Sequence, residues 1–343
     1  MKTPVTVITG FLGAGKTTLL RHLLTHAAGR RIAVIINEFG DLGVDRELLL
    51  GCGIAGCGED DLVELPNGCI CCTVADAFLP TIERLLHRVD PPDHIVIETS
   101  GLALPKPLIK AFDWPEVRSR ATVDAVVAVV DAAAVAAGQF DGDGSGRAGA
   151  LAGGQPVDHE SPLEELFEDQ VLAADLVVLN KTDLVDPTML AAVRGRVGVT
   201  ARPATKVIPA RHGGLDLTAL LGVGAAAEDD LAARPSHHDA PGPDDDHGHD
   251  EFESFVVELA AIADPAVLER RLSRVLAEHD VLRVKGFLDV PDKAMRHVVQ
   301  AVGPRIQRYY DRPWQVDEAR LSRLVVIGRS PLDQAAVQAA LAG

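Results

Sequence analysis

Short apolar runs of strand length recur through the first two thirds of the chain, and helix-like stretches separate them. The runs are rich in β-branched residues without polar alternation, which is typical of strands buried on both faces. The five main runs are Val5–Thr9, Ile32–Ile36, His94–Ile97, Val126–Val130 and Leu176–Leu179, and two further candidates are Val63–Leu65 and Thr205–Ile208. Helical patterns occupy Lys16–His26, Val74–His87 and Leu163–Ala173. This alternation predicts an α/β fold with a mostly parallel sheet covered by helices.

The order of elements changes toward the end of the chain. The pattern there predicts strands and helices at Phe252–Leu259 (strand), Pro265–Glu278 (helix), Val281–Val290 (strand), 295–310 (extended runs), Leu321–Ile327 (strand) and Leu332–Leu341 (helix). Mixed strands with two helices predict a small α+β domain of the ferredoxin-like type.

An acidic segment separates these two patterns. Residues 226–253 carry one basic side chain, Arg234, against ten acidic ones, together with prolines, glycines and four histidines. A segment with so few apolar residues cannot bury enough surface to offset its ordering entropy. We therefore expect a first domain at 1–225 with a glycine-rich insertion near 138–162, a flexible linker at 226–251 and a second domain at 252–343.

Composition excludes several classes of protein. The 343 residues fit two domains, whereas an aromatic content of 4% and a net charge of −17 argue against binding to nucleic acid. The most apolar stretch, Ala121–Phe140, is interrupted by Asp124 and Asp131, so no membrane span is predicted. The N-terminus shows no small-residue cleavage site, and we expect a cytoplasmic protein.

A glycine-rich loop follows the first predicted strand. Its sequence, Gly10-Phe-Leu-Gly-Ala-Gly-Lys-Thr17, fits the phosphate-binding pattern G-x-x-x-x-G-K-[ST]. Such a loop turns backbone N–H groups toward phosphate oxygens at a helix N-terminus, while Lys16 reaches the β- and γ-phosphates and the Thr17 hydroxyl binds Mg²⁺. A glycine-rich turn with a chance lysine is the alternative, which the strand–loop–helix context disfavours. The predicted phosphate-binding residues are Gly10, Gly13, Ala14, Gly15, Lys16, Thr17 and Thr18.

A second motif, Asn180-Lys-Thr-Asp183, follows the strand that ends at Leu179. The Asp183 carboxylate can accept hydrogen bonds from guanine N1–H and from its exocyclic amine, and adenine lacks that pair of donors. Asn180 would approach the opposite edge of the base, and the stem of Lys181 could pack over the ring. Alone the tetrapeptide could be an ordinary turn, but downstream of a phosphate loop it predicts guanine recognition. Ile208-Pro-Ala210 is a weaker candidate for a further contact to the base.

Acidic residues follow two other strands. Glu98-Thr-Ser-Gly101 ends the third long apolar run, where Glu98 can hold the Mg²⁺ shell and the Gly101 N–H can sense the γ-phosphate. We assign catalytic roles to Glu98 together with the loop lysine and threonine, Lys16 and Thr17; a strand-end capping turn is the alternative for this segment. Asn37-Glu-Phe-Gly40 is placed as a first nucleotide switch whose acids are Glu38 and Asp45, although either acid taken singly could be a surface carboxylate.

All five cysteines lie within 21 residues of one another. They are Cys52, Cys57, Cys69, Cys71 and Cys72, with the spacing C-x4-C-x11-C-x-C-C. Three thiolates in four residues can converge on a borderline or soft cation such as Zn²⁺ or Co²⁺, although zinc fingers use a different spacing. Disulfides and buried inert cysteines are the alternatives. The cluster lies between the two predicted switches, so the state of the γ-phosphate could alter its geometry.

These motifs, in this order, resemble the CobW family of P-loop metal-chaperone GTPases. The residues that carry the resemblance are Gly10–Thr18, Asn37–Gly40, Cys69-Ile-Cys-Cys72, Glu98–Gly101, Asn180–Asp183 and Val284–Leu288. The motif detail looks closest to the branch associated with cobalt handling in aerobic cobalamin biosynthesis. The resemblance therefore implies Co²⁺ as the metal. The thiol spacing alone does not select Co²⁺, because Zn²⁺ should outcompete it at thiolates by intrinsic affinity.

The hypothesis from sequence is a slow GTPase whose Mg·GTP form assembles a metal site and whose hydrolysis releases the ion. The candidate ligands are Cys69, Cys71 and Cys72, with Glu38 as a further oxygen donor. Cobaltochelatase or another metalloenzyme is the expected client; the oligomeric state and the role of Cys52 and Cys57 stay open.

Three alternatives remain at this point. The nearest is zinc delivery to a zinc enzyme by a member of the same family. A P-loop small-molecule kinase and a non-enzymatic metal reservoir belong to other classes. The reservoir rests on the linker histidines, His237, His238, His247 and His249, for which a solvated linker is the ordinary interpretation.

Overall fold

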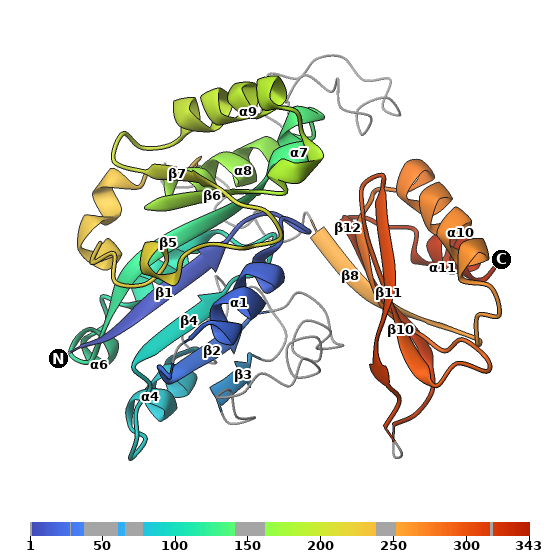
Figure 1. The fold of residues 1–343 in the computed structure, drawn as a ribbon, viewed down its shortest axis with the longest axis horizontal. Coiled ribbons are helices and arrows are strands. Elements are labelled where there is room, and N and C mark those ends of the chain that lie inside the picture. The colour runs from blue at the N-terminus through green and yellow to red at the C-terminus, as the bar shows by residue number, and fades with distance from the viewer. Residues whose placement is uncertain are drawn as a thin grey trace. The chain divides into compact units, whose positions relative to one another are not determined.

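The computed structural model describes residues 2–27, 29–37, 61–65, 78–140, 162–237, 252–315 and 318–343. These residues belong to two compact units. Among the described residues, the first unit extends to His237 and the second begins at Phe252. Figure 1 shows a sheet flanked by helices in the first unit and a second sheet with two helices in the other. Each unit is described by itself.

Seven parallel strands form the sheet of the first unit, in the order β3-β2-β4-β1-β5-β6-β7. Their bounds are Thr3–Thr9 (β1), Ile32–Ile36 (β2), Leu62–Glu64 (β3), His94–Glu98 (β4), Ala121–Asp131 (β5), Leu176–Asn180 (β6) and Lys206–Pro209 (β7). The predicted α/β fold with a parallel sheet is confirmed.

Helices connect these strands. The α-helices are Lys16–Thr25 (α1), Leu79–Leu86 (α4), Pro105–Ala111 (α5), Pro115–Arg118 (α6), Ala132–Ala136 (α7), Pro162–Leu172 (α8) and Pro187–Thr200 (α9). Short 3₁₀ turns lie at Thr182–Leu184 (η3), Leu217–Ala219 (η4) and Ala227–Ala233 (η5). Of the helix predicted at Val74–His87, only the part from residue 78 onward lies within the described residues.

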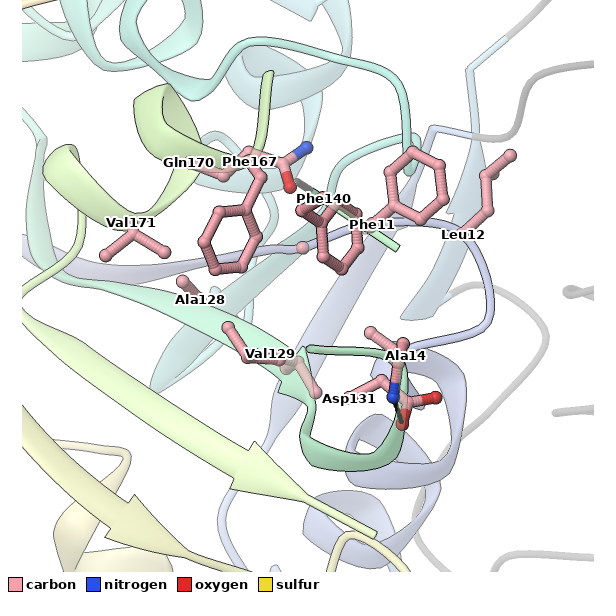
Figure 2. A pocket seen from close by; sticks show the side chains of 13 residues that line it. Phe11, Leu12, Ala14, Ala128, Val129, Asp131, Phe140, Phe167, Gln170 and Val171 are labelled. Atoms are coloured by element: carbon pink, nitrogen blue, oxygen red, sulfur yellow. Dashed lines mark hydrogen bonds between the residues drawn. The ribbon is translucent and has the colours of Figure 1, made fainter. Parts of the chain in front are cut away.

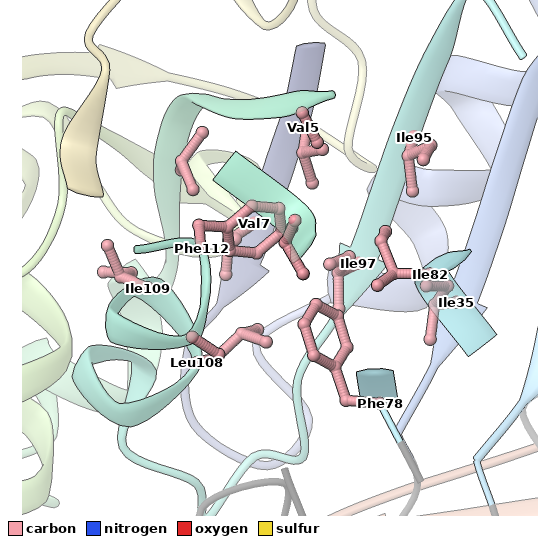
Figure 3. Packing of buried hydrophobic residues seen from close by; sticks show 14 of the residues in the cluster. Val5, Val7, Ile35, Phe78, Ile82, Ile95, Ile97, Leu108, Ile109 and Phe112 are labelled. Atoms are coloured by element: carbon pink, nitrogen blue, oxygen red, sulfur yellow. The ribbon is translucent and has the colours of Figure 1, made fainter. Parts of the chain in front are cut away.

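One face of the sheet packs its apolar side chains against α4 and α5. Alternate residues of β1 and β4, such as Val7 and Ile97, are fully buried there against Phe78, Ile82 and Phe112 (Figure 3). Burying such side chains contributes roughly 1.5–3 kcal/mol each. The sheet is thereby held as a rigid base for the loops that leave its carboxyl edge.

Strand β5 is longer than the predicted run Val126–Val130, and it contains two buried aspartates, Asp124 and Asp131. The Asp124 carboxylate accepts hydrogen bonds from the backbone N–H groups of Gly222 and Gly224 at 2.7 and 2.8 Å. Asp131 ends the strand as the N-cap of α7. The cost of burying the two acids that interrupt the apolar pattern is therefore offset by hydrogen bonds from backbone N–H groups.

The segment predicted as a linker begins with residues that pack on the first unit. The buried Glu228 carboxylate accepts a hydrogen bond from the backbone N–H of Val123 at 2.9 Å. Arg234 is only 1% exposed and donates to the Asp175 carboxylate at 2.7 Å. Folded structure thus continues beyond residue 225, and charge composition is misleading here because the charges are individually paired.

The first linker histidine is also held on the first unit. His237 Nδ1 lies 2.8 Å from Asp169 Oδ1 on α8, and Nε2 lies 3.4 Å from a carboxylate oxygen of Glu168. Ser236 Oγ donates to the second oxygen of Asp169 at 2.7 Å. His238, His247 and His249 lie outside the described residues.

The second unit contains a five-stranded antiparallel sheet in the order β11-β10-β9-β12-β8. Its elements are Phe252–Leu259 (β8), Pro265–Glu278 (α10), Val281–Leu288 (β9), Met295–Val302 (β10), Arg305–Pro313 (β11), Ser322–Arg329 (β12) and Gln334–Ala342 (α11). Because β12 lies between β8 and β9, these strands and α10 form a split β-α-β unit, the part shared with ferredoxin-like folds. The hairpin β10–β11 extends the sheet on the far side of β9. The predicted α+β class is confirmed.

Helix α10 illustrates why the second unit was predictable. Asp264 caps its N-terminus by accepting from Ala266 N at 2.9 Å, and Pro265 occupies its first turn. Leu268, Leu272 and Val275 recur at helical spacing and are buried against the sheet.

None of the helices in the described ranges has the length and the apolar run needed to cross a bilayer.

A buried histidine makes the stability of the first unit depend on pH. His94 is 4% exposed, with Nε2 2.8 Å from Thr6 Oγ1. Burial lowers the pKa of His94 to about 4, although nearby Asp124 acts in the opposite direction. The unfolded chain binds more protons than the folded one between pH 6.5 and 4, so stability falls as pH decreases through that window. We expect the wild type to lose about 3 kcal/mol of unfolding free energy from this group between pH 7 and 4, and His94→Gln should not show that loss.

Urea unfolding at several pH values measures this effect. Exposed His87→Gln is the matched control, and it should keep the wild-type pH dependence. An unchanged slope in His94→Gln would show that other groups carry the loss of stability.

Candidate nucleotide-binding site

The predicted nucleotide residues gather at the carboxyl edge of the first sheet. β1, β4, β5 and β6 end in Thr9, Glu98, Asp131 and Asn180, and β1 and β5 lie between β4 and β6. Parallel strands end at one edge of a sheet, so the loops that follow them converge there, where open α/β sheets bind ligands.

The glycine-rich loop is held in a conformation that requires glycine at its end. Gly15 has a φ of +106°, and a Cβ atom there would lie 2.2 Å from Asn180 Nδ2. A side chain at this position would therefore separate the phosphate loop from the Asn180 motif. The helix begins at the next residue, Lys16, so backbone N–H groups at its N-terminus lie beside the loop.

Lys16 lies folded over its own loop. The side chain is 6% exposed, and Nζ donates to the carbonyl oxygens of Gly10 at 2.6 Å and Phe11 at 3.3 Å. The ammonium group is thus positioned inside the ring of backbone that the motif predicts to surround phosphate. Thr18, two residues further along α1, lies exposed.

Thr17 and Glu98 form a pair of oxygen groups beside this loop. Thr17 Oγ1 donates to Glu98 Oε1 at 3.1 Å, and Glu98 is 4% exposed. The backbone of Glu98 also accepts from Asn37 N at 2.9 Å, which brings the start of the predicted first switch to the same edge. A hydroxyl and a carboxylate are oxygen donors of the kind Mg²⁺ prefers, so these residues fit that ion.

The loop after β4 packs directly on the phosphate loop. A Cβ atom at Gly101 would lie 2.7 Å from Leu12 N, so only glycine allows this approach. Gln170 on α8 is 2% exposed, and its Nε2 donates to the carbonyl oxygens of Gly101 and Ala103 at 3.3 Å each. The segment predicted to sense the γ-phosphate is therefore tied to α8.

Asn180 connects three loops. It is 2% exposed, its Nδ2 donates to Ala14 O at 2.9 Å, and its Oδ1 accepts from Gly213 N at 3.0 Å. The predicted role was an approach to the base, whereas the structure uses both ends of the amide to hold the phosphate loop and the loop after β7. Sequence reasoning missed this bridging function.

The other residues of the motif have distinct surroundings. Lys181 Nζ donates to Gly13 O and to Asp131 Oδ2, at 2.7 Å each. Asp183 is exposed, with Oδ2 3.8 Å from His212 Nε2. Ala210, a weaker candidate for a base contact, instead accepts hydrogen bonds from the backbone N–H and the hydroxyl of Thr182 at 3.2 and 2.9 Å.

An apolar pocket lies beside the phosphate loop rather than over it. Phe11, Phe140 and Phe167 form one wall, with Phe140 and Phe167 stacked at 4.7 Å, and Asp131 lies at the edge (Figure 2). Its volume of about 10 Å³ holds no more than one water molecule. We interpret it as a packing gap rather than a ligand site.

The predicted metal-binding residues belong to segments outside the described part of the chain. Glu38 and the cysteines Cys52, Cys57, Cys69, Cys71 and Cys72 lie outside the described residues, as does Asp45. Within the ranges that the structure does describe, no group of three or more His, Cys, Asp or Glu side chains is arranged to hold a metal ion.

Two functional-site residues escaped prediction. Gln170 belongs to a helix whose pattern gives no hint of a polar contact with the nucleotide edge. In the sequence, Asp131 stands out only because it interrupts an apolar stretch. Its position at the end of β5, the strand next to β6, could have indicated a role at this edge of the sheet.

Comparison with known proteins identifies both units. Residues 4–209 match the model of the family described as CobW/HypB/UreG, nucleotide-binding domain. Residues 252–343 match the model described as cobalamin synthesis protein cobW C-terminal domain.

Individual relatives agree with these matches. A Sinorhizobium protein named zinc chaperone CobW is 59% identical over 341 residues, covering 99% of this chain and 96% of its own. A Pseudomonas aeruginosa protein of the same name is 53% identical over 340 residues, covering 98% and 90% of the two chains. The zinc-regulated GTPase metalloprotein activator 1 of Schizosaccharomyces pombe is 36% identical over 219 residues, covering 62% and 47%.

These names confirm the family of metal-chaperone GTPases that the motifs predict, while cobalt stays a prediction. The chain belongs to the CobW/HypB/UreG family of nucleotide-binding proteins.

Proposed function

We propose that this chain is a GTP-hydrolysing metallochaperone. It binds Zn²⁺ at the Cys69-x-Cys71-Cys72 motif in its Mg·GTP form and delivers the ion to a zinc-dependent enzyme. The observation that carries the nucleotide half is the bridge made by Asn180, which fixes the phosphate loop beside the loop that bears Asp183.

The roles of individual residues follow from their positions. Lys16 moves from the carbonyl groups of Gly10 and Phe11 to the β- and γ-phosphates when a nucleotide fills the loop. Asp183 lies exposed beyond the end of β6, so its carboxylate is available to guanine N1–H and the exocyclic amine. Thr17 and Glu98 are the proposed holders of Mg²⁺, which when bound neutralises charge on the phosphate oxygens.

The cargo half rests on chemistry and on relatives. Three cysteine side chains within four residues offer thiolates, which bind Zn²⁺ well and more tightly than Co²⁺. Two relatives that share more than half of their residues with this chain carry the name zinc chaperone. The motif follows the proposed first switch and precedes Glu98–Gly101, so hydrolysis can alter the metal affinity through the switches.

Cobalt is the second candidate, favoured by the motif detail of the nucleotide and cysteine segments. In that case the client is cobaltochelatase and the process is cobalt insertion into a corrin ring. Cobalamin production by a deletion strain, with and without added Co²⁺ or Zn²⁺, separates the two metals. A loss of cobalamin that added Co²⁺ restores would favour cobalt over zinc.

Asp183→Asn should reverse the base preference. The carboxylate matches two donors of guanine, whereas the amide presents an N–H group that matches the C2 carbonyl of xanthine. We expect GTP affinity to fall about 100-fold, as loss of a charged pair of hydrogen bonds implies, and xanthosine triphosphate to bind better than GTP. Titration with fluorescent analogues of both nucleotides measures the change.

Asp186→Asn is the matched control, because Asp186 lies three residues away, is exposed, and caps α9 by accepting from Thr188 N and Met189 N. Asparagine caps helices well, so the control should bind GTP as the wild type does. Tight ATP binding by the wild type would favour a small-molecule kinase instead.

Nucleotide should gate metal affinity. Competition with a chromophoric chelator should give Zn²⁺ an affinity roughly 5- to 150-fold higher with a nonhydrolysable GTP analogue and Mg²⁺ than with GDP, the usual range of coupling between two sites. The double variant Cys71→Ser, Cys72→Ser should lose that difference, together with Co²⁺-to-thiolate charge-transfer absorption when Co²⁺ is the probe.

Cys52→Ser with Cys57→Ser changes the same number of thiols outside the motif and serves as the comparison. Equal Zn²⁺ affinity in both nucleotide states of the wild type would end the gating proposal. Loss of gating in the comparison variant alone would move the site to Cys52 and Cys57.

A further inference from the structure

Asp131 is a buried carboxylate that the proposed chemistry of nucleotide binding does not use. It closes β5 and is 5% exposed. In the sheet register it lies directly beside Asn180 of β6, so the next residue of that motif, Lys181, begins the loop in front of it. A charged group at this place requires an explanation, because burial of an unpaired carboxylate is costly.

The two oxygens of Asp131 make different contacts. Oδ1 accepts from the backbone N–H groups of Ala133 and Ala134, at 3.0 Å each, and thereby caps α7. Oδ2 lies 2.7 Å from Lys181 Nζ. Asp131 and Ala14 of the phosphate loop both line the aromatic pocket (Figure 2). Because the cap fixes the carboxylate, its second oxygen presents a fixed acceptor to the lysine.

Lys181 carries this fixed position to the phosphate loop. Its backbone has a left-handed φ of +59°, and Nζ also donates to Gly13 O at 2.7 Å. Three loops, after β1, β5 and β6, therefore meet at one ammonium group. A lysine side chain has up to about 2 kcal/mol of rotamer entropy to lose when it is ordered. Ordering it before the nucleotide arrives removes that cost from binding.

We propose that Asp131 is a positioning residue for guanine-nucleotide binding, which holds Lys181 on the Gly13 carbonyl so that the phosphate loop and the guanine-reading loop form one preorganised surface. This inference rests on the guanine-nucleotide half of the proposed function. Asp131 itself does not touch the nucleotide; it acts through Lys181.

Asp131→Asn tests the role with little change in shape. The amide keeps an oxygen to cap α7, since asparagine is a strong N-cap, but it removes the negative charge opposite Lys181. We expect Kd for GDP and GTP to rise about tenfold, mainly through faster dissociation, and KM to rise with kcat changed less than twofold. Asp131→Ser, which also caps, should behave in the same way. Stopped-flow with fluorescent nucleotides and steady-state phosphate release supply these values.

The matched control is again Asp186→Asn, an N-cap aspartate of the same domain whose carboxylate accepts from Thr188 N and Met189 N at the start of α9. It should leave nucleotide Kd unchanged. Melting temperatures of all variants separate a general loss of stability from a loss of affinity. A lowered melting temperature with unchanged Kd in both Asp131 variants would reduce the pair to a structural contact and overturn the proposal.

A double-mutant cycle identifies the partner through which Asp131 acts. Lys181→Met keeps the aliphatic stem and removes the ammonium group. In that background Asp131→Asn should change Kd less than twofold, whereas an undiminished tenfold effect would show that Asp131 acts independently of Lys181 and would overturn the proposal. Wild-type titration with GDP and ADP comes first. A preference for ADP would overturn the guanine assignment itself, while guanine binding with an additive cycle would overturn only the positioning role.

Discussion

A single buried amide, the side chain of Asn180, determines how far the phosphate loop can lie from the loops that follow β6 and β7. Its two hydrogen bonds contribute about 0.5–1.5 kcal/mol each when formed, but leaving the buried partners unpaired would cost about 1–3 kcal/mol each. The Gly15 backbone lies against the same amide, so steric contact and hydrogen bonding set one spacing. If the phosphate loop or the loop after β7 moved away from Asn180, a buried polar group would lose its hydrogen-bond partner.

Charged groups at this edge are held by hydrogen bonds to the backbone. Lys16 and Lys181 both donate to carbonyl oxygens of the phosphate loop, and Asp131 accepts from the N-terminus of α7. Under the proposed function, the Lys16 ammonium exchanges its carbonyl partners for phosphate oxygens, whereas Lys181 keeps the contact with Gly13 that Asp131 supports. The frame of the site would then be ordered before the nucleotide arrives, which lowers the cost of binding.

Strands and motifs were predictable from sequence because they depend on local patterns. Parallel strands buried on both faces are continuous apolar runs, and a phosphate loop needs its glycines wherever it occurs. Helix α9 was missed because its apolar residues follow no helical stripe, although Asp186 and Pro187 form a cap and first turn that signal its start. Contacts between distant segments, such as Arg234 with Asp175 or Gln170 with Gly101, leave no local trace, since each depends on the tertiary fold.

Helix α8 holds two different structures with consecutive residues. Asp169 binds Ser236 and His237, where the chain leaves the first unit, and Gln170 binds the backbone after β4. Neighbouring residues of a helix point about 100° apart, so one rigid cylinder serves two partners on different sides. The segment by which the chain leaves the first unit and the loop after β4 are thus both bound to one helix, and the position of α8 sets the position of both.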